Sequence, residues 1–317
     1  MATMTLVSIA AIRAAADRIK GVARRTPLLD VSDIAGRSLH LKCENLQPIG
    51  AFKIRGAYNM IARLDPAERA RGVITYSSGN HGNAVAYAAK KLGISAVIVM
   101  PTTAPAVKIE SARELGAEVI FEGTTTLHRK ARAEKEQYER GLVMVPPFDH
   151  EWIIEGQGTV GLEIAEQLPE VGTVVVQVGG GGLIAGTSAA LKALKPGVRV
   201  IGAEPAGAPK MTMSREAGHP VTLESSRSIA DGLLAVRPGE LPFLHAQQFV
   251  DDVVTVSEDA IVRATRWLFE RAHLVVEPSG AVAVAAVFEN RVQGEDPVVA
   301  VLSGGNVSLE TLAALHA

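Results

Sequence analysis

Short runs of β-branched residues alternate with longer amphipathic stretches along most of this chain. Runs such as TVVVQV (173–178) and ISAVIVMP (94–101) are apolar on both faces, which is typical of strands buried in a parallel sheet between layers of helices. The alternation predicts an α/β fold with parallel sheets flanked by helices. In such folds ligands bind beyond the carboxyl ends of the strands, so the loops after the strands are the place to look for a site.

The pattern also predicts where the regular elements lie. We expect strands within 72–80, 94–101, 118–123, 173–178, 198–205 and 297–306. We expect helices within 81–93, 106–117, 127–141, 183–195, 258–272 and 279–290. A chain of 317 residues is long enough for two domains, and we expect two α/β lobes with a ligand site between them.

Charge and composition narrow the class of protein. The 32 Lys and Arg residues nearly balance 34 Asp and Glu residues, for a net charge of −2, so no electrostatic field favours nucleic acid or an anionic membrane. No apolar run is long enough to span a bilayer, and charges interrupt the N-terminal stretch where a signal peptide has its apolar core. The single cysteine, Cys43, fits a reducing compartment. We therefore expect a cytoplasmic protein.

The most distinctive loop follows the predicted strand 173–178, where four glycines precede a predicted helix. Gly179, Gly180, Gly181 and Gly182 have no Cβ, so their backbone N–H groups can close around an anion, and the helix N-terminus adds a favourable dipole. Thr187 stands where a P-loop has lysine, which argues against nucleotide hydrolysis. The loop predicts a phosphate site and does not say which phosphate.

The same loop also fits a nicotinamide dinucleotide. Gly180, Gly182 and Ala185 satisfy the G-x-G-x-x-G/A pattern, and Glu204 ends the next predicted strand, where an acidic residue binds the ribose in such proteins. An NAD-dependent oxidoreductase is an alternative that this loop leaves open.

Two further strand ends and one lysine stand out. The loop SSGNHGNA (77–84) offers hydroxyl, amide and backbone donors that can hold a carboxylate, although serine and asparagine are also ordinary helix caps. The loop LSGGN (302–306) places Ser303 beside two glycines. In AFKIRGA (51–57), Lys53 lies among apolar residues. It is either a surface residue at the start of a helix or an amine with a chemical role.

Taken together, these stretches resemble the pyridoxal-phosphate enzymes of the tryptophan-synthase β fold (fold type II), specifically the threonine/serine dehydratase and serine racemase group. The resemblance covers nearly the whole chain and follows the order of the family's motifs. These are AFKIRGA, SSGNHG, EGQGT, VGGGG, AEP, IADG, EPSGA and LSGGN. It displaces the NAD-dependent alternative, which leaves Lys53 and the serine loops without a role.

The resemblance implies an architecture and an assembly. It implies a large cofactor-binding domain made of 1–71 and 150–317, and a small domain, 72–149, that closes over the active site. It also implies a homodimer. Few residues follow LSGGN, so we expect no C-terminal regulatory domain.

Residue by residue, the resemblance implies a complete cofactor and substrate site. Lys53 corresponds to the lysine that binds the cofactor covalently and acts as a base at the substrate α-carbon, and Phe52 to the residue stacked on the pyridine ring. The glycines 179–182 correspond to the phosphate loop, Asn80 to the side chain at the phenolic oxygen, and Ser303 to the residue at the pyridine nitrogen. The substrate carboxylate is expected on Ser77, Ser78, Asn80 and His81.

The implied reaction is an α,β-elimination that converts a β-hydroxy-α-amino acid to a keto acid and ammonia. L-Threonine, L-serine and a 3-hydroxyaspartate-like compound are the candidate substrates. Ser78 leaves a second reaction open, because serine racemases use a serine there as the acid and base on the face opposite the lysine. Racemisation by Lys53 and Ser78 is therefore the alternative. A non-catalytic cofactor-binding module is another, which would show no turnover.

Lys210 departs from the family pattern, and His128 and Arg129 bear on the choice of substrate. Relatives activated by a divalent cation bind it after AEP, but Lys210 stands at the position of the acidic ligand, where its ammonium would repel a cation and pair with Glu204. We expect no divalent metal there; a side chain of Lys210 that points to solvent would leave room for a monovalent ion. His128 and Arg129 lie near the position where a related racemase binds a second carboxylate, or else on a solvated helix face.

Overall fold

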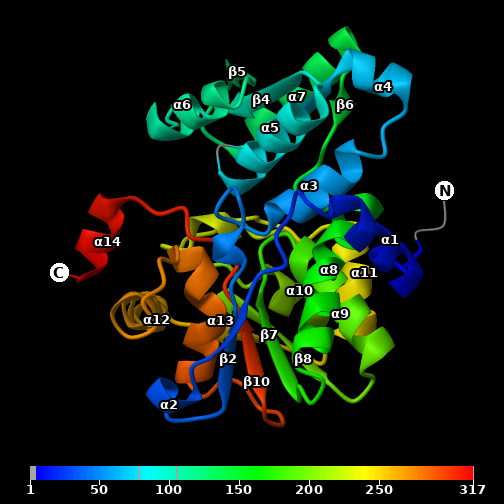
Figure 1. The fold of residues 1–317 in the computed structure, drawn as a ribbon. Coiled ribbons are helices and arrows are strands. Elements are labelled where there is room, and N and C mark those ends of the chain that lie inside the picture. Colours follow the sequence, from blue (N-terminus) through cyan, green and yellow to red (C-terminus); the bar gives the residue numbers. More distant parts are fainter. Residues whose placement is uncertain (1–4, 78, 105, 317) are drawn as a thin grey trace.

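Two parallel sheets, each covered by helices on both faces, make up the molecule. The computed structural model describes residues 5–77, 79–104 and 106–316. Figure 1 shows the smaller sheet with α5, α6 and α7 above the larger sheet, and α3 between the two. This confirms the α/β class with parallel sheets flanked by helices. In the described part of the chain, no helix combines the length and the apolar character needed to cross a membrane.

The strands and helices follow the alternation in the sequence. The strands are β1 (Leu28–Asp30), β2 (Leu39–Lys42), β3 (Val73–Tyr76), β4 (Ala96–Met100), β5 (Glu118–Phe121), β6 (Val143–Met144), β7 (Thr173–Gln177), β8 (Arg199–Pro205), β9 (Asp252–Val256) and β10 (Val298–Val301). The α-helices are α1 (Ile9–Ile19), α2 (Ser32–Ala35), α3 (Lys53–Ile61), α4 (Pro66–Arg71), α5 (Asn80–Leu92), α6 (Ala106–Glu114), α7 (Thr126–Arg140), α8 (Glu151–Gln167), α9 (Gly182–Leu194), α10 (Lys210–Ala217), α11 (Glu240–Phe249), α12 (Glu258–Glu270), α13 (Pro278–Phe288) and α14 (Leu309–His316). Two 3₁₀ turns are η1 (Glu44–Leu46) and η2 (Asp231–Leu233).

The larger sheet has the strand order β1-β2-β10-β7-β8-β9. All neighbours run parallel except β1 and β2, which pair antiparallel at one edge. Successive residues of a strand point to opposite faces: Val174 and Val176 pack with α8 and α9, whereas Val175 packs with α12 and α13. This two-sided burial explains why the centre of β7 is apolar on both faces.

The smaller sheet has the order β5-β4-β3-β6 and is parallel throughout. Ile98 faces the core formed with α5, and its neighbours Val97 and Val99 face α7. Helix α3 contributes Ile54 and Ile61 to the same core as α5, so α3 joins the two sheets. Every predicted strand and helix is present, with ends that differ by a few residues from those expected. Elements without a sequence prediction include α8, β9 and the antiparallel pair β1–β2.

The polar loops therefore meet where the two sheets approach each other. The loop after β3 leads into α5, the loop after β7 leads into α9, and the loop after β10 carries LSGGN. All three follow the carboxyl ends of parallel strands, the edge at which α/β proteins bind ligands.

Candidate active site

Lys53 is the first residue of α3 and its side chain is partly buried. Its Nζ donates a hydrogen bond to the carbonyl oxygen of Pro147 at 2.7 Å and lies 5.2 Å from the centre of the Phe52 ring. Enclosure by protein lowers the pKa of the Lys53 amine to about 8, because desolvation penalises the ammonium form. The lysine of AFKIRGA is therefore held in an internal site where a neutral amine is accessible near physiological pH.

The loop before Lys53 is paired with the loop LSGGN. Ala51 and Gly304 form an isolated antiparallel bridge. The backbone N–H of Phe52 donates to the Ser303 carbonyl at 3.0 Å, and that of Gly305 donates to the Gly50 carbonyl at 2.8 Å. Ser303 itself is 4% exposed. Two of the sequence motifs, 250 residues apart, thus form one wall of the site.

His81 lies in the first turn of α5, buried, with its Nε2 3.0 Å from the carbonyl oxygen of Val145. A carbonyl only accepts, so Nε2 carries the hydrogen and Nδ1 presents a lone pair. Burial, with the nearby charge of Lys53, lowers the pKa of His81 to about 3. Among the described residues Nδ1 has no hydrogen-bond partner. His81 is thus a neutral side chain with one unused acceptor inside the site.

Ser77 and Gly79 precede α5, which begins at Asn80. Oγ of Ser77 accepts from the backbone N–H of Gly79 at 3.2 Å, and a Cβ on Gly82 would overlap the Ser77 carbonyl. Among the described residues, no side chain caps the start of α5, so its backbone donors can bind an anion. Ser78, predicted as a substrate and racemisation residue, lies outside the described residues.

The glycine loop has the features of a phosphate site. Gly181 is the N-cap of α9 with φ +97°, a conformation that favours glycine, and within the described chain no side chain accepts a hydrogen bond from the first amides of the helix. A Cβ on Gly180 would overlap the ring of Phe148. A 13-residue helix whose first amides have no side-chain acceptor is suited to a phosphate. With the enclosed Lys53 amine nearby in the fold, these residues fit pyridoxal phosphate.

Lys210 and Glu204 form a fully buried ion pair. The Lys210 Nζ lies 3.0 Å from Oε1 of Glu204 and donates to the carbonyl oxygens of Val178 at 2.7 Å and Ala208 at 3.1 Å. Burial lowers the pKa of Lys210, and the attraction of Glu204 opposes that effect. Lys210 pairs with Glu204 as the sequence predicts, and an orientation toward solvent is excluded.

Glu204 is also unsuited to a ribose. Its carboxylate accepts from the backbone N–H groups of Met211 and Thr212 and from the Thr212 hydroxyl, each at 2.9 Å. With Lys210 added, its oxygens are fully engaged within the fold. The acidic residue on which the NAD-dependent alternative depended already has partners.

His128 and Arg129 lie at the start of α7. His128 is exposed, and the guanidinium of Arg129 donates to the Thr124 carbonyl at 3.3 Å and the Thr126 hydroxyl at 2.9 Å. Among the described residues, no hydrogen bond or ion pair connects either side chain with Lys53 or the glycine loop. His128 and Arg129 therefore lie in the first turn of α7 without a described contact to the other predicted site residues.

Sequence reasoning missed the segment between β6 and α8. Val145 accepts from His81, Pro147 accepts from Lys53, and Phe148 packs on the glycine loop. The carboxylate of Asp149 accepts from the first two backbone N–H groups of α11, each at 3.0 Å. Carbonyl groups carry no sequence signature, so only the strand and helix on either side could have drawn attention to this segment.

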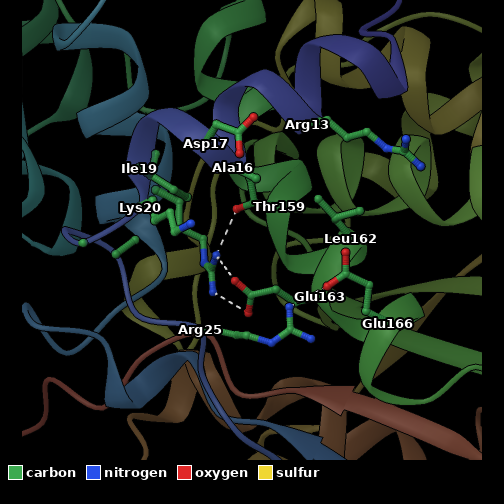
Figure 2. A pocket seen from close by; sticks show the side chains of 13 residues that line it. Arg13, Ala16, Asp17, Ile19, Lys20, Arg25, Thr159, Leu162, Glu163 and Glu166 are labelled. Atoms are coloured by element: carbon green, nitrogen blue, oxygen red, sulfur yellow. Dashed lines mark hydrogen bonds and ion pairs between the residues drawn. The ribbon is translucent and has the colours of Figure 1, made fainter.

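Arg55, close to Lys53 in the sequence, has a structural role instead. It is buried and pairs with Glu44 and Glu163, each at 2.7 Å, while Lys42 pairs with the other oxygen of Glu163 at 2.5 Å. A cleft of about 540 Å³ lies next to this network, between α1 and α8 (Figure 2). Among the described residues, none of those predicted for the active site lines it.

Comparisons with known proteins agree with this site. The family model for pyridoxal-phosphate dependent enzymes matches residues 19–304. The chain is 44% identical over 310 residues to an L-threonine ammonia-lyase of Thermotoga maritima, covering 97% of this chain and 77% of that protein. It is 44% identical over 313 residues to a serine racemase of Arabidopsis thaliana, covering 96% and 94%.

The solved structure of maize serine racemase superimposes with a TM-score of 0.93 at 41% identity, covering 98% of this chain and 97% of that one. The resemblance in the motifs, the geometry around Lys53 and these matches agree. This chain belongs to the family of pyridoxal-phosphate dependent enzymes.

Proposed function

We propose that this protein is a pyridoxal-phosphate dependent ammonia-lyase that converts a β-hydroxy-α-amino acid to a keto acid and ammonia by α,β-elimination. The observation that carries the proposal is the enclosed Lys53 amine, whose pKa is lowered to about 8, in a fold that also presents a glycine loop and an anion-binding helix start. The similarity to an L-threonine ammonia-lyase along 97% of this chain supports the reaction class.

The cofactor would be held by residues from four loops. Lys53 would bind it covalently, the N–H groups of the glycines 179–182 would take the phosphate, and Phe52 would stack on the ring. Asn80 would donate to the phenolic oxygen and Ser303 would face the pyridine nitrogen. A serine hydroxyl holds a proton on that nitrogen less firmly than a carboxylate, which favours prompt elimination over transamination.

Bound pyridoxal phosphate supplies an electron-accepting system that stabilises negative charge at the substrate α-carbon. Lys53 takes the proton from that carbon onto Nζ, and a pKa of about 8 makes it an effective base near neutral pH. The Pro147 carbonyl accepts from Nζ at 2.7 Å, and this contact orients the amine when it is not bonded to another group.

The substrate carboxylate would lie at the start of α5, on Ser77, Ser78, Asn80 and His81. No described side chain caps this helix start, and its backbone N–H groups would act as donors. His128 and Arg129, at the rim of the smaller lobe, are proposed to meet the distal end of an acidic substrate such as 3-hydroxyaspartate. L-Threonine and L-serine have no charged group at that end, so their use would leave the pair without a catalytic role.

We propose further that 72–149 acts as a small domain that closes on the large domain, 1–71 and 150–317. Two contacts support this division: Asn80 on α5 donates to Glu277 at the start of α13 at 2.7 Å, and Lys108 on α6 lies 3.6 Å from Asp231 in η2. A homodimer and a cytoplasmic location are also proposed; sedimentation of the purified protein would test the first.

Racemisation is the second candidate. It is supported by 44% identity to a serine racemase along 96% of this chain and by a serine at position 78. A racemase must deliver a proton to the face of the α-carbon opposite Lys53, the role proposed for Ser78.

A product assay on purified holoenzyme tests both candidates. L-Serine, L-threonine, D-serine and the 3-hydroxyaspartate isomers are each supplied, and keto acid and amino-acid chirality are measured in the same sample. Keto acid and ammonia in equal amounts, without the opposite enantiomer, would support the ammonia-lyase. An enantiomer that appears faster than keto acid would make the protein a racemase, and no turnover of any substrate would contradict both.

A further inference from the structure

Glu277 is a buried acid at the site that the mechanism above does not use. It is 6% exposed, it is the N-cap residue of α13, and its Oε1 accepts a hydrogen bond from Nδ2 of Asn80 at 2.7 Å. The other end of the same amide, Oδ1 of Asn80, accepts from Nδ2 of Asn306 at 2.8 Å. Asn80 is thus held from both ends.

The orientation of both amides follows from this chain of bonds. Asn306 also donates from Nδ2 to the Ile49 carbonyl at 2.9 Å, so its two N–H groups both face oxygens and its nitrogen and oxygen are not interchangeable. The oxygen of Asn80 must then face Asn306, and its nitrogen must face Glu277. The second N–H of Asn80 has no partner among the described residues.

Two glycines leave space for these hydrogen-bonded side chains. A Cβ on Gly304 would overlap Oε1 of Glu277, and a Cβ on Gly50 would overlap Oδ1 of Asn306. The backbone N–H of Glu277 donates to the Gly304 carbonyl at 3.1 Å. The bonds therefore connect three of the sequence motifs, SSGNHG, EPSGA and LSGGN, with the residues just before AFKIRGA.

We propose that Glu277 and Asn306 are positioning residues that hold the Asn80 amide in one orientation and keep its remaining N–H for the phenolic oxygen of the cofactor. This rests on the proposed function, which assigns Asn80 to that oxygen. Neither Glu277 nor Asn306 touches the reacting atoms in this account; both act through Asn80.

The charge state of Glu277 makes this arrangement sensitive to pH. Burial, with the negative charge of Asp231 from η2, raises the pKa of Glu277 to about 7, while the bond from Asn80 and the positive charge of Lys108 on α6 act in the opposite direction. Asn80 and Asn306 are uncharged. Glu277 is therefore neutral below pH 7 and an anion above it, and the bond from Asn80 becomes charge-assisted as the pH rises.

Three variants and a control test the proposal. Glu277→Gln keeps an acceptor for Asn80 but does not titrate, Glu277→Ala removes the acceptor, and Asn306→Ala removes the donor at the other end. Glu216→Gln, an exposed carboxyl on α10, is the matched control. For each, the dissociation constant of pyridoxal phosphate from the apo-protein and the visible spectrum of the holoenzyme are measured from pH 6 to pH 9, with thermal unfolding as a check of folding.

We expect Glu277→Ala to weaken cofactor binding by roughly tenfold or more, as for the loss of a hydrogen bond to a charged group, and Asn306→Ala to weaken it by about three- to tenfold, as for the loss of a neutral hydrogen bond. We expect Glu277→Gln to bind within about threefold of the wild type and to lose the spectral change centred near pH 7. In an Asn80→Ala background the effect of Glu277→Ala should disappear, because the two residues act through one amide.

Failure of the inference is distinguishable from failure of the proposed function. If the wild type binds pyridoxal phosphate and Asn80→Ala weakens it, but Glu277→Ala keeps wild-type affinity and spectrum, the positioning role is wrong. Additive effects of Asn80→Ala and Glu277→Ala, or an unchanged pH response in Glu277→Gln, would also overturn it. A wild type that binds no pyridoxal phosphate would instead refute the proposed function.

Discussion

The ammonium of Lys210 lies 3.0 Å from the carboxylate of Glu204, and neither side chain has any exposed surface. The same ammonium donates to the carbonyl of Val178, the residue immediately before the glycine loop. One buried cation thus connects the end of β7, the end of β8 and the start of α10. Because an ammonium has three N–H donors, its three oxygen contacts use all of them.

Lys210→Met should destabilise the protein strongly. The methionine has a similar length but no charge, so Glu204 stays buried without its partner, which costs about 3–5 kcal/mol. Urea unfolding of the apo-protein measures this. The double variant Lys210→Met/Glu204→Gln should recover part of the loss. A single variant within about 1 kcal/mol of the wild type would mean that the pair contributes little to folding.

The position that Lys210 occupies also leads to a prediction about metals. An ammonium at the place of a cation ligand repels a divalent ion, so dialysis against a strong chelator should leave the activity of the holoenzyme unchanged, and added Mg²⁺ or Ca²⁺ should not raise it. A loss of activity on chelation that either ion restores would show that a metal binds despite Lys210.

Gly180→Ala should impair the cofactor site. The added Cβ would overlap the ring of Phe148, and relief of such overlap by movement of the loop costs about 1–3 kcal/mol. We expect weaker binding of pyridoxal phosphate by the apo-protein, measured by fluorescence titration. Gly197→Ala is the matched control, since its Cβ would meet no atom within 4 Å. Equal affinities in the two variants would contradict a phosphate role for the loop.

Uptake of the cofactor should depend on pH through Lys53. Only the neutral amine reacts with an aldehyde, and the pKa of Lys53 is lowered to about 8. The rate of covalent uptake by the apo-protein should rise about tenfold per pH unit below pH 8 and level off above it. Stopped-flow absorbance from pH 6.5 to 10 measures this rate. A rise that continues unchanged to pH 10 would show an ordinary lysine.

The lowered pKa of Lys53 also makes the stability of the folded protein depend on pH. The direction is opposite to that of a lysine in a salt bridge, whose pKa is raised. Between pH 8 and the ordinary lysine value near 10.5, the unfolded chain binds a proton at Lys53 that the folded apo-protein does not. The stability of the apo-protein should therefore rise with pH across that interval as far as Lys53 is concerned. Comparison with Lys53→Met isolates this contribution in urea unfolding at pH 8 and pH 10.

The sheets were predictable because their strands are buried on both sides. Residues 174–176 and 96–100 are uniformly apolar, and glycine or polar loops follow soon after them; such runs indicate strands of a parallel sheet. The edge pair β1–β2 was not predicted: these short strands, LLD and LHLK, contain charged or polar residues and form no apolar run. Short strands depend on their neighbours in the sheet.

Helix α8 escaped prediction for a different reason. It is buried on nearly every side, so it lacks the polar stripe that identifies a surface helix, and Gly156, Gly158 and Gly161 lower its helix propensity. The structure explains these glycines: a Cβ at Gly156 would overlap α3 at Arg55, and one at Gly161 would overlap α9 at Thr187. Close packing between helices at these positions outweighs the low helix propensity of glycine.

The sequence predicts the site residues whose side chains belong to a motif. It does not predict the backbone groups that also form the site. Lys53 and the glycine loop stand out as residue types in a pattern. The Pro147 carbonyl, which accepts from Lys53, leaves no trace in the sequence. Glu277 lies within the motif EPSGA, but only the fold shows that its carboxyl faces Asn80, 197 residues away.

The most direct test of the account compares the wild type with Lys53→Ala after both are purified and supplied with pyridoxal phosphate. The visible spectrum is recorded, and keto acid release is followed with L-threonine and L-serine. We predict an absorption band and turnover in the wild type, and the loss of covalent cofactor with at least a thousandfold slower turnover in Lys53→Ala, on the order expected when an acid–base group that also binds the cofactor is removed. A Lys53→Ala variant that releases keto acid at the wild-type rate would contradict the central role of Lys53.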